Sequence, residues 1–341
     1  MVKTALLVSL GEWTNRTFAL PIVVFFPTSR CNSRCLSCDW WKASGEGDLS
    51  MEEVACVAAE LPALGTRMVL FSGGEPLLRP EVFEMAALFR AQGLVLHLHT
   101  SGILLERFAE KVVPAFSRVI VSLDACDEGA YRAIRGVNAL QTLERGVARL
   151  RDLAPHLPVT ARSTLHKQNY RELPRLVEHA KAMGLEGISF LAADLGSGAF
   201  GRPPGGYGAD LALDRDEIVE FADVVERVIA DREDDFTSGF IAEAPAKLRR
   251  LPQHYAALAG LAPFPPVRCN APSVSVVVEA DGSVRPCFFH DAIGSIRERP
   301  LRELVARNLA AFRETLSVSE NPVCERCVCS MRTSWRSAPW Q

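Results

Sequence analysis

Three cysteines in one short segment constrain this chain more than any other feature of its sequence. Cys31, Cys35 and Cys38 are spaced four and then three positions apart, directly after the apolar run 22–26. Such a run indicates a buried strand, so the cysteines are expected on the loop at a strand's carboxyl end, where α/β folds place their chemistry. Three thiolates can hold three irons of a 4Fe–4S cube and leave the fourth iron open for a small molecule. Zinc is the alternative, since it also takes thiolate ligands.

The composition excludes several classes of function. Hydrophobic residues at 48%, charged residues at 23% and a net charge of −3 are ordinary for a globular protein and predict neither a nucleic-acid nor a membrane partner. No apolar run approaches the roughly 20 residues that span a bilayer. The ten cysteines are mostly clustered, which indicates metal ligation in a reducing compartment. We therefore expect a cytoplasmic protein.

Short apolar runs alternate with amphipathic stretches from residue 22 to about residue 232. The apolar runs are 22–26, 68–71, 94–99, 118–123, 159–164 and 187–191. The amphipathic stretches are near 50–61, 80–91, 104–113, 140–153, 170–183 and 214–231. Six βα units in succession predict an α/β fold with a parallel sheet, as a partial or full barrel.

This pattern divides the chain into four parts. We expect an N-terminal extension at 1–20, the barrel at 21–235, a linker of short helices at 236–268 and a small metal-stapled module at 269–341. The glycine- and proline-rich segment 195–208 follows the sixth strand. It is interpreted either as a mobile loop over the site or as a surface insertion.

A second motif, Gly73-Gly74-Glu75-Pro76, follows the apolar run 68–71. Paired glycines allow a ligand to approach the backbone closely. Together with the cysteine loop one βα unit earlier, it resembles the CxxxCxxC and GGEP signature of the radical S-adenosylmethionine (SAM) superfamily. The resemblance implies a (β/α)6 partial barrel and a 4Fe–4S cluster on the three cysteines, with SAM on its open iron. It also implies cleavage of SAM to a 5′-deoxyadenosyl radical that takes hydrogen from a substrate C–H bond.

The resemblance also suggests residues that contact SAM. These candidates are Ser37, Gly73, Gly74, Glu75, Ser122 and Arg162. Ser122 ends the fourth predicted strand, where a serine that satisfies nearby backbone is the alternative. Arg162 is on the fifth strand, where a buried arginine is costly unless it meets an anion such as the SAM carboxylate. His97 and His99 are at alternate positions and so face one side of their strand, either lining a cavity or hydrogen-bonded in the core.

The C-terminal cysteines form a third motif. Cys269 is followed by twelve residues, Gly282, four residues and Cys287, and a C-x-x-C pair follows at Cys324 and Cys327. An Asp-Gly hairpin turn would bring the first two together, and by itself such a four-thiolate set favours zinc. After a radical SAM barrel it resembles the twitch or SPASM module, which implies an auxiliary 4Fe–4S cluster. The further cysteines of a full SPASM pattern are missing, so one cluster is expected, with Cys329 as an alternative ligand.

The resemblance leaves the reaction open. An auxiliary cluster that accepts an electron implies oxidation, such as dehydrogenation of a small molecule in a biosynthetic pathway. A peptide maturase that forms a cross-link, a redox-neutral epimerase and, more distantly, a non-catalytic iron–sulfur or zinc scaffold are the alternatives. Only about twenty residues precede the first strand, too few for a leader-binding segment, which favours a small molecule over a peptide. A flavodoxin- or ferredoxin-type electron donor is expected.

Two further cysteines lie outside these motifs. Cys56 is predicted to lie on the core-facing side of the first amphipathic helix. No catalytic residue is assigned, and Cys126 is the weak candidate for a cavity-facing thiol, with a plain buried cysteine as the favoured interpretation.

Overall fold

The computed structural model describes residues 8, 11, 18–202 and 210–333. Within them a single sheet has the strand order β6-β5-β4-β3-β2-β1-β7-β8-β9. Its strands are β1 (Ile22–Phe25), β2 (Met68–Phe71), β3 (Val95–Thr100), β4 (Arg118–Ser122), β5 (Val159–Leu165), β6 (Ile188–Ala192), β7 (Ser275–Val278), β8 (Ser283–Arg285) and β9 (Gly294–Ser295). Strands β1 to β7 pair in parallel, and β8 and β9 pair antiparallel. The predicted α/β fold with a parallel sheet is therefore confirmed.

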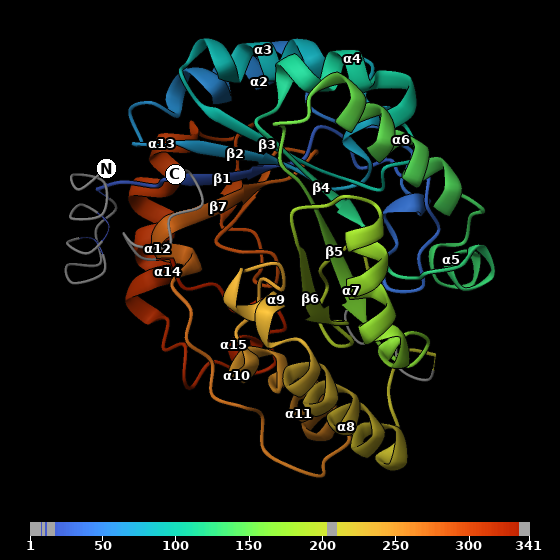
Figure 1. Cartoon of the computed structure of the whole chain (residues 1–341). Helices are drawn as coiled ribbons and strands as arrows, with labels where there is room; N and C mark the ends of the chain where they lie inside the picture. Colours follow the sequence, from blue (N-terminus) through green and yellow to red (C-terminus); the bar gives the residue numbers. More distant parts are fainter. Residues whose placement is uncertain (1–7, 9–10, 12–17, 203–209, 334–341) are drawn as a thin grey trace.

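Helices alternate with the first six strands and pack against the sheet (Figure 1). The longer ones are α2 (Met51–Glu60), α3 (Val82–Ala91), α4 (Leu105–Ala115), α5 (Glu128–Arg135), α6 (Leu140–Leu153), α7 (Leu173–Ala182) and α8 (Arg215–Asp231). Single 3-10 turns are η1 (Trp40–Lys42), η2 (Pro76–Leu78) and η3 (Tyr170–Glu172). The apolar faces of the helices pack on one side of the strands and form a large core. A smaller cluster of Val24, Phe26, Val277 and Ala280 lies on the other side. Among the described residues, no helix is long and apolar enough to cross a membrane.

Helix α2 shows how local sequence sets these elements. Ser50 Oγ accepts from the Glu53 N–H at 3.2 Å, and the Ser50 N–H donates to the Glu53 carboxylate at 2.8 Å. This capping box satisfies free N–H groups at the start of the helix. Val54 and Val57 face the sheet and are buried, whereas Cys56 is exposed. The prediction that Cys56 is a core residue is wrong, because the helical period turns position 56 away from the buried stripe.

The segment 236–268, expected to be a linker, is packed onto the barrel. It contains α10 (Pro245–Leu248) and α11 (Arg250–Leu258), while α9 (Glu233–Thr237) begins just before it. The buried Tyr255 of α11 donates from its hydroxyl to Leu165 O at 2.7 Å and accepts from the Ala193 N–H at 3.0 Å. This residue therefore ties the ends of β5 and β6 together.

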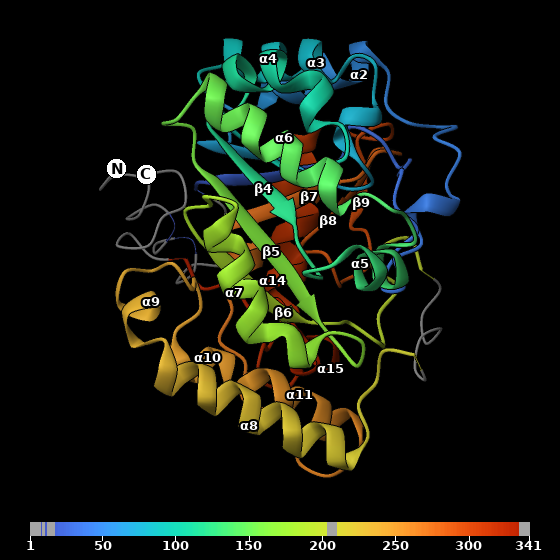
Figure 2. The same ribbon diagram turned by 45° about the vertical axis from the view of Figure 1, so that its right-hand side comes forward.

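The C-terminal segment continues the same sheet. Strand β7 pairs in parallel with β1, with Ile22 opposite Ser275, and the predicted hairpin β7–β8 follows. After it come α13 (Leu301–Glu303), the π-helical turn η4 (Leu304–Leu309), α14 (Ala310–Thr315) and α15 (Pro322–Glu325). The short helix α12 (Ala271–Val274) leads into β7. Because β1 is shared, the cysteines after β1 and those flanking β7 and β8 belong to neighbouring strands (Figures 1 and 2).

Candidate functional site

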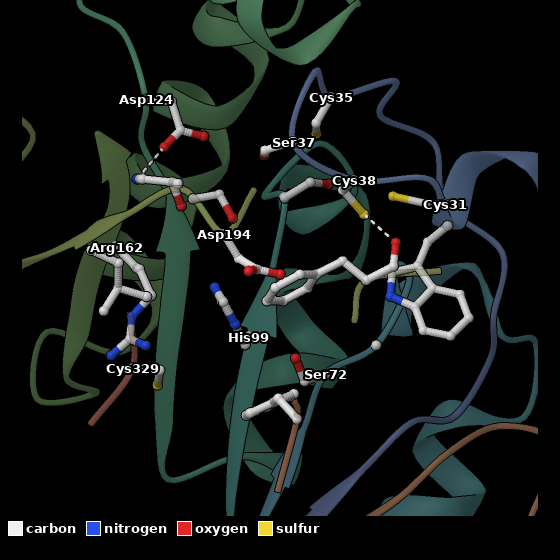
Figure 3. A pocket seen from close by; sticks show the side chains of 18 of the residues that line it. Cys31, Cys35, Ser37, Cys38, Ser72, His99, Asp124, Arg162, Asp194 and Cys329 are labelled. Carbon is white, nitrogen blue, oxygen red and sulfur yellow. Dashed lines mark hydrogen bonds between the residues drawn. The ribbon is translucent and has the colours of Figure 1, made fainter. Parts of the chain in front are cut away.

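The three-cysteine loop lines one end of a cavity of about 220 Å³ at the carboxyl ends of the strands (Figure 3). Burial raises the pKa of the Cys31 thiol to about 11 and also raises the pKa values of Cys35 and Cys38. The Cys31 and Cys35 charges raise the Cys38 pKa further. Three buried thiolates this close together are unfavourable unless cations or a metal cluster offset their charge.

The GGEP loop holds the cysteine loop through backbone contacts. The Gly74 N–H donates to Thr28 O at 3.2 Å and the Glu75 N–H to Arg30 O at 2.7 Å. A Cβ on Gly74 would lie 2.1 Å from Arg30 O, and one on Gly73 would lie 2.6 Å from the Phe26 ring. Both glycines also line the cavity. They are therefore needed for the close approach of two loops as well as for any ligand.

Glu75 has a different place from the one expected of a SAM contact. Its side chain is fully buried and is not among the residues that line the cavity. The carboxylate accepts from Thr100 Oγ1 at 2.7 Å, from the Ser101 N–H at 2.7 Å, and from Ser101 Oγ at 2.6 Å. It thus ties the β2 loop to the end of β3, so the carboxylate positions this loop, while a contact of Glu75 with SAM stays a prediction.

The other predicted SAM contacts line this cavity, from the cysteine loop, the GGEP loop and strands β4 and β5. Ser37, Ser122 and Arg162 are all on its wall. Ser122 and Arg162 are paired partners on β4 and β5, and Arg162 Nε donates to Ser189 Oγ at 3.2 Å. This bond orients the guanidinium while the side chain still faces the cavity (Figure 3).

His99 lies between the two ends of the cavity (Figure 3). Its Nε2 is shut off from solvent and has no hydrogen-bond partner within the described residues. Burial, together with the charges of Arg162 and Arg135, lowers the pKa of His99 to about 3. His99 is therefore a neutral imidazole that can bond to a bound molecule, whereas His97 lines a second cavity.

The sequence did not reveal the role of Arg135. This residue ends α5, lines the cavity and forms an ion pair with Asp124, Nη1 to Oδ2 3.0 Å. The neighbouring backbone also binds the cysteine loop, since the Arg34 N–H donates to Arg135 O at 2.8 Å. The Arg135 charge lowers the pKa of Cys35 against the effect of burial. The sequence signal that could have located helix α5 is Asp127 as its N-cap and Gly136 as its C-cap.

A segment after β6 closes over the cysteine loop. The Asp39 N–H donates to Phe200 O at 2.9 Å, and Cys38 Sγ lies 3.6 Å from the same oxygen. Arg202 binds Asp194 at 2.7 Å beneath it, with both side chains buried. Residues 195–202 of the predicted loop thus form part of the site, and 203–209 lie outside the described residues.

The C-terminal thiols line a second cavity of about 450 Å³ on the β7 side of the sheet. These thiols are Cys269, Cys287, Cys324, Cys327 and Cys329. Asn270 and Thr333 bring the two ends of this segment together, with the Thr333 N–H donating to Asn270 Oδ1 at 2.9 Å. His290 is also present, its Nε2 3.3 Å from Cys324 Sγ, and the sequence gave no sign of it.

Cys329 has a special place in this group. Of the ten cysteines, which all lie within the described residues, it alone lines both cavities, facing Arg162 in Figure 3. Cys126 lines neither, and packs beside the core instead. The structure therefore gives no support to Cys126 as a cavity-facing thiol.

The thiol sets suit iron–sulfur clusters in donor type and arrangement. Among residues 18–202 and 210–333, no three His, Cys, Asp or Glu side chains converge on a point that one metal ion would fill. Cys31, Cys35 and Cys38 line the first cavity and five C-terminal thiols line the second, and a 4Fe–4S cube binds its cysteines at separate corners. The residues present therefore fit one cluster on Cys31, Cys35 and Cys38 and a second on the C-terminal thiols.

Two family models match the chain. The radical SAM superfamily matches residues 25–180, and the SPASM iron–sulfur cluster-binding domain matches residues 269–328. The predicted resemblance to a radical SAM enzyme with a C-terminal SPASM-like module is therefore confirmed, and members of this superfamily are enzymes. These domains use a 4Fe–4S cluster with SAM and auxiliary iron–sulfur clusters, respectively.

Curated relatives match part of the chain. Fe-coproporphyrin III synthase of Methanosarcina barkeri is 33% identical over 165 residues, 46% of this chain and 40% of that protein. PqqA peptide cyclase of Bradyrhizobium diazoefficiens is 31% identical over 172 residues, 48% of this chain and 44% of that protein. The chain thus spans about half the length of the curated relatives that it matches.

Solved structures share the fold over nearly the whole chain. SuiB of Streptococcus suis bound to SAM has a TM-score of 0.66 at 13% identity, covering 95% of this chain and 76% of that one. Native anSMEcpe with bound AdoMet and the Cp18Cys peptide has a TM-score of 0.64 at 19% identity, covering 90% and 86%. At these identities the likeness is one of fold.

Proposed function

We propose that this chain oxidises a polar small molecule in a biosynthetic pathway by removing hydrogen from one of its C–H bonds. The observation that carries the proposal is the cavity between two thiol sets, with Cys31, Cys35 and Cys38 at one end and Cys329 at the other. The first cluster with SAM would supply the 5′-deoxyadenosyl radical that takes the hydrogen atom. An auxiliary cluster on Cys269, Cys287, Cys324 and Cys327 would accept the remaining electron.

The residues between the thiol sets would bind SAM and substrate. Gly73, Gly74, Ser37 and Ser122 surround the end near the first cluster and are proposed to hold SAM. His99 and Asp194 line the space between that end and Cys329 and would bind substrate hydroxyl or amine groups. A neutral His99 would accept a hydrogen bond from a substrate O–H. With a pKa of about 3 it would pass on to another acceptor, and not keep, the proton that leaves when the O–H becomes C=O.

Arg162 borders both cavities. It would hold an anion, either the SAM carboxylate or an acidic group of the substrate.

A peptide substrate is the second candidate. It is favoured by the 31% identity to a PqqA peptide cyclase over half the chain. SuiB was also crystallised with its precursor peptide SuiA, and it shares the fold. A redox-neutral epimerisation is a further alternative, in which Cys329 would return a hydrogen atom to the substrate.

The experiment is anaerobic reconstitution followed by reduction with dithionite in the presence of SAM. We expect 5′-deoxyadenosine from the wild type and none from a Cys31/Cys35/Cys38→Ala variant. About eight irons in the wild type and about four in the variant would support an auxiliary cluster. Absence of SAM cleavage in reconstituted wild type would contradict the proposed function.

Deuterium-labelled substrates distinguish the substrate classes. Polar small molecules and peptides labelled at C–H positions are incubated with SAM, and label transfer into 5′-deoxyadenosine is measured. Transfer from a small molecule with a product two hydrogens lighter supports the dehydrogenation. Transfer only from a peptide supports the second candidate, and a product in which one deuterium has been replaced by a solvent-derived hydrogen supports epimerisation.

A cytoplasmic location is proposed on the same chemistry, because thiols that hold iron–sulfur clusters need a reducing compartment.

A further inference from the structure

A basic and aromatic patch lies on the surface beside the cysteine loop. Trp41 in η1 is 37% exposed, although it is a large aromatic side chain. The Arg34 guanidinium carbon lies 5.9 Å from its ring centroid, and Lys42 Nζ lies 5.2 Å from it. Arg34 and Lys42 are themselves exposed. We call Arg34, Trp41, Lys42 and Arg132 the Trp41 patch.

Arg132 lies in the last turn of helix α5, which adjoins Arg34. The Gly136 N–H at the end of α5 donates to Arg132 O at 2.9 Å, and a Cβ on Gly136 would lie 2.6 Å from the Arg34 Cβ. Arg34 and the last turn of α5 are thus in contact. Figures 1 and 2 both place the blue segment that follows β1 next to α5 at the edge of the molecule.

The patch has an unbalanced positive charge. Lys42 pairs with Asp39 at 2.8 Å. In the part of the chain that the structure describes, neither Arg34 nor Arg132 forms an ion pair. Other exposed arginines of the barrel helices do, such as Arg145 with Glu106 and Arg149 with Glu110. An unpaired arginine over an exposed tryptophan, with a second unpaired arginine in the adjoining turn of α5, is typical of a recognition surface, because Trp and Arg are among the residues most enriched at binding hot spots.

The patch is also close to the thiols that would hold the first cluster. Arg34 is the residue before Cys35, and Trp41 follows Cys38 by three positions. Three residues reach at most about 11 Å even when fully extended. A protein docked on this surface would therefore bring its own redox group as near to the first cluster as the outer surface allows.

We propose that the Trp41 patch is the docking surface for an acidic one-electron carrier protein of the flavodoxin or ferredoxin type. The carrier loses one electron and the cluster at Cys31, Cys35 and Cys38 gains it, which is the electron that cleavage of SAM consumes. Complementary charge would steer this encounter. A small patch suits it, since electron-transfer complexes have interfaces at the low end of the size range. The inference rests on the cluster assignment in the proposed function and is independent of the substrate.

The test compares two electron sources in the reconstituted holoenzyme. Arg34→Glu/Arg132→Glu reverses both charges, and Arg67→Glu/Arg90→Glu makes the same change elsewhere. Both control arginines are exposed and without an ion pair in the described residues, and they precede β2 and β3 at the opposite end of the strands. SAM cleavage is measured with a reduced acidic flavodoxin and, separately, with dithionite, which is too small to need a docking surface.

We expect the Arg34/Arg132 variant to lose at least tenfold in the flavodoxin-driven rate and to stay within twofold of wild type with dithionite. The control variant should keep both rates. Titration with oxidised flavodoxin should show weaker binding by the Arg34/Arg132 variant and a flatter dependence of affinity on salt. Trp41→Ala should also weaken binding without flattening that dependence.

Each of the following results would contradict a different part of the proposal. Equal loss with flavodoxin and dithionite would mean that the variant damages the cluster loop, and unchanged flavodoxin binding would remove the docking role. If an acidic peptide substrate loses affinity while flavodoxin binding is unchanged, the patch serves the substrate instead. Absence of dithionite-driven SAM cleavage in the wild type would contradict the proposed function, while the flavodoxin titration would still decide whether this surface binds the carrier.

Discussion

Arg135 Nη1 and Asp124 Oδ2 form an ion pair of 3.0 Å between helix α5 and the end of strand β4. Both side chains are largely buried, at 11% and 7% exposure. Asp124 also accepts from the Thr164 N–H of β5 at 2.8 Å. The pair thus links the cysteine loop, through Arg135, to two strands that line the cavity.

Loss of this pair should destabilise the fold strongly. Arg135→Gln leaves the Asp124 carboxylate buried without its cation, and breaking a buried pair typically costs about 3–5 kcal/mol. We expect a loss of about 3 kcal/mol in the free energy of unfolding, measured by anaerobic urea denaturation. Arg145→Gln is the control, because its 3.0 Å pair with Glu106 is exposed and should contribute less than about 1 kcal/mol. Equal losses in the two variants would contradict the prediction.

Gly74→Ala should detach the cysteine loop from the GGEP loop. The new Cβ would lie 2.1 Å from Arg30 O and 2.8 Å from Ser29 O, so the backbone next to Cys31 must move. We expect reconstituted protein to lose the irons of the first cluster while keeping those of the auxiliary cluster. Gly196→Ala is the matched control, because nothing lies within 4 Å of a Cβ there. A full iron content in Gly74→Ala would refute this account of the loop.

Most of the fold could be predicted because hydrophobic periodicity and the residues that begin or end helices and strands are local signals in the sequence. The run 68–71 matches β2 and the stretch 140–153 matches α6 residue for residue. The pairing of β7 with β1 could not be predicted, since nothing in either strand specifies a partner 250 positions away. Helix α5 was missed because eight residues are too short a stretch to establish a helical period.

The residues of the candidate site were likewise predictable only where a local motif marks them. Motif residues such as Cys31 and Gly74 could be identified by spacing. The role of Glu75 could not, because its three close partners on Thr100 and Ser101 exist only once β2 and β3 are paired. Arg135 and His290 were not identified, since only packing brings them to the thiols.

Cys329→Ala should leave the auxiliary cluster in place if four other thiols hold it. We expect iron content within about 10% of the wild type after reconstitution, whereas Cys327→Ala should lose the irons of that cluster. Substrate turnover in D2O then reports the chemistry. Loss of solvent-derived deuterium from the product in Cys329→Ala would identify its thiol as a hydrogen donor and favour epimerisation. Loss of iron in Cys329→Ala would make it a ligand.

Removal of His99 should flatten the acid dependence of stability. The pKa of His99 is about 3 in the folded chain and about 6.5 when unfolded. The unfolded chain therefore binds the extra proton between these values, so the contribution of His99 to stability is fully present above pH 6.5 and is lost as the pH falls. Between pH 7 and pH 5 this costs the wild type about 2 kcal/mol that His99→Gln should not lose. The measurement is urea denaturation of both proteins at several pH values in that range. The other buried histidines titrate in both proteins, so parallel pH profiles would show that His99 is protonated in the folded site and would remove it as a neutral hydrogen-bond acceptor.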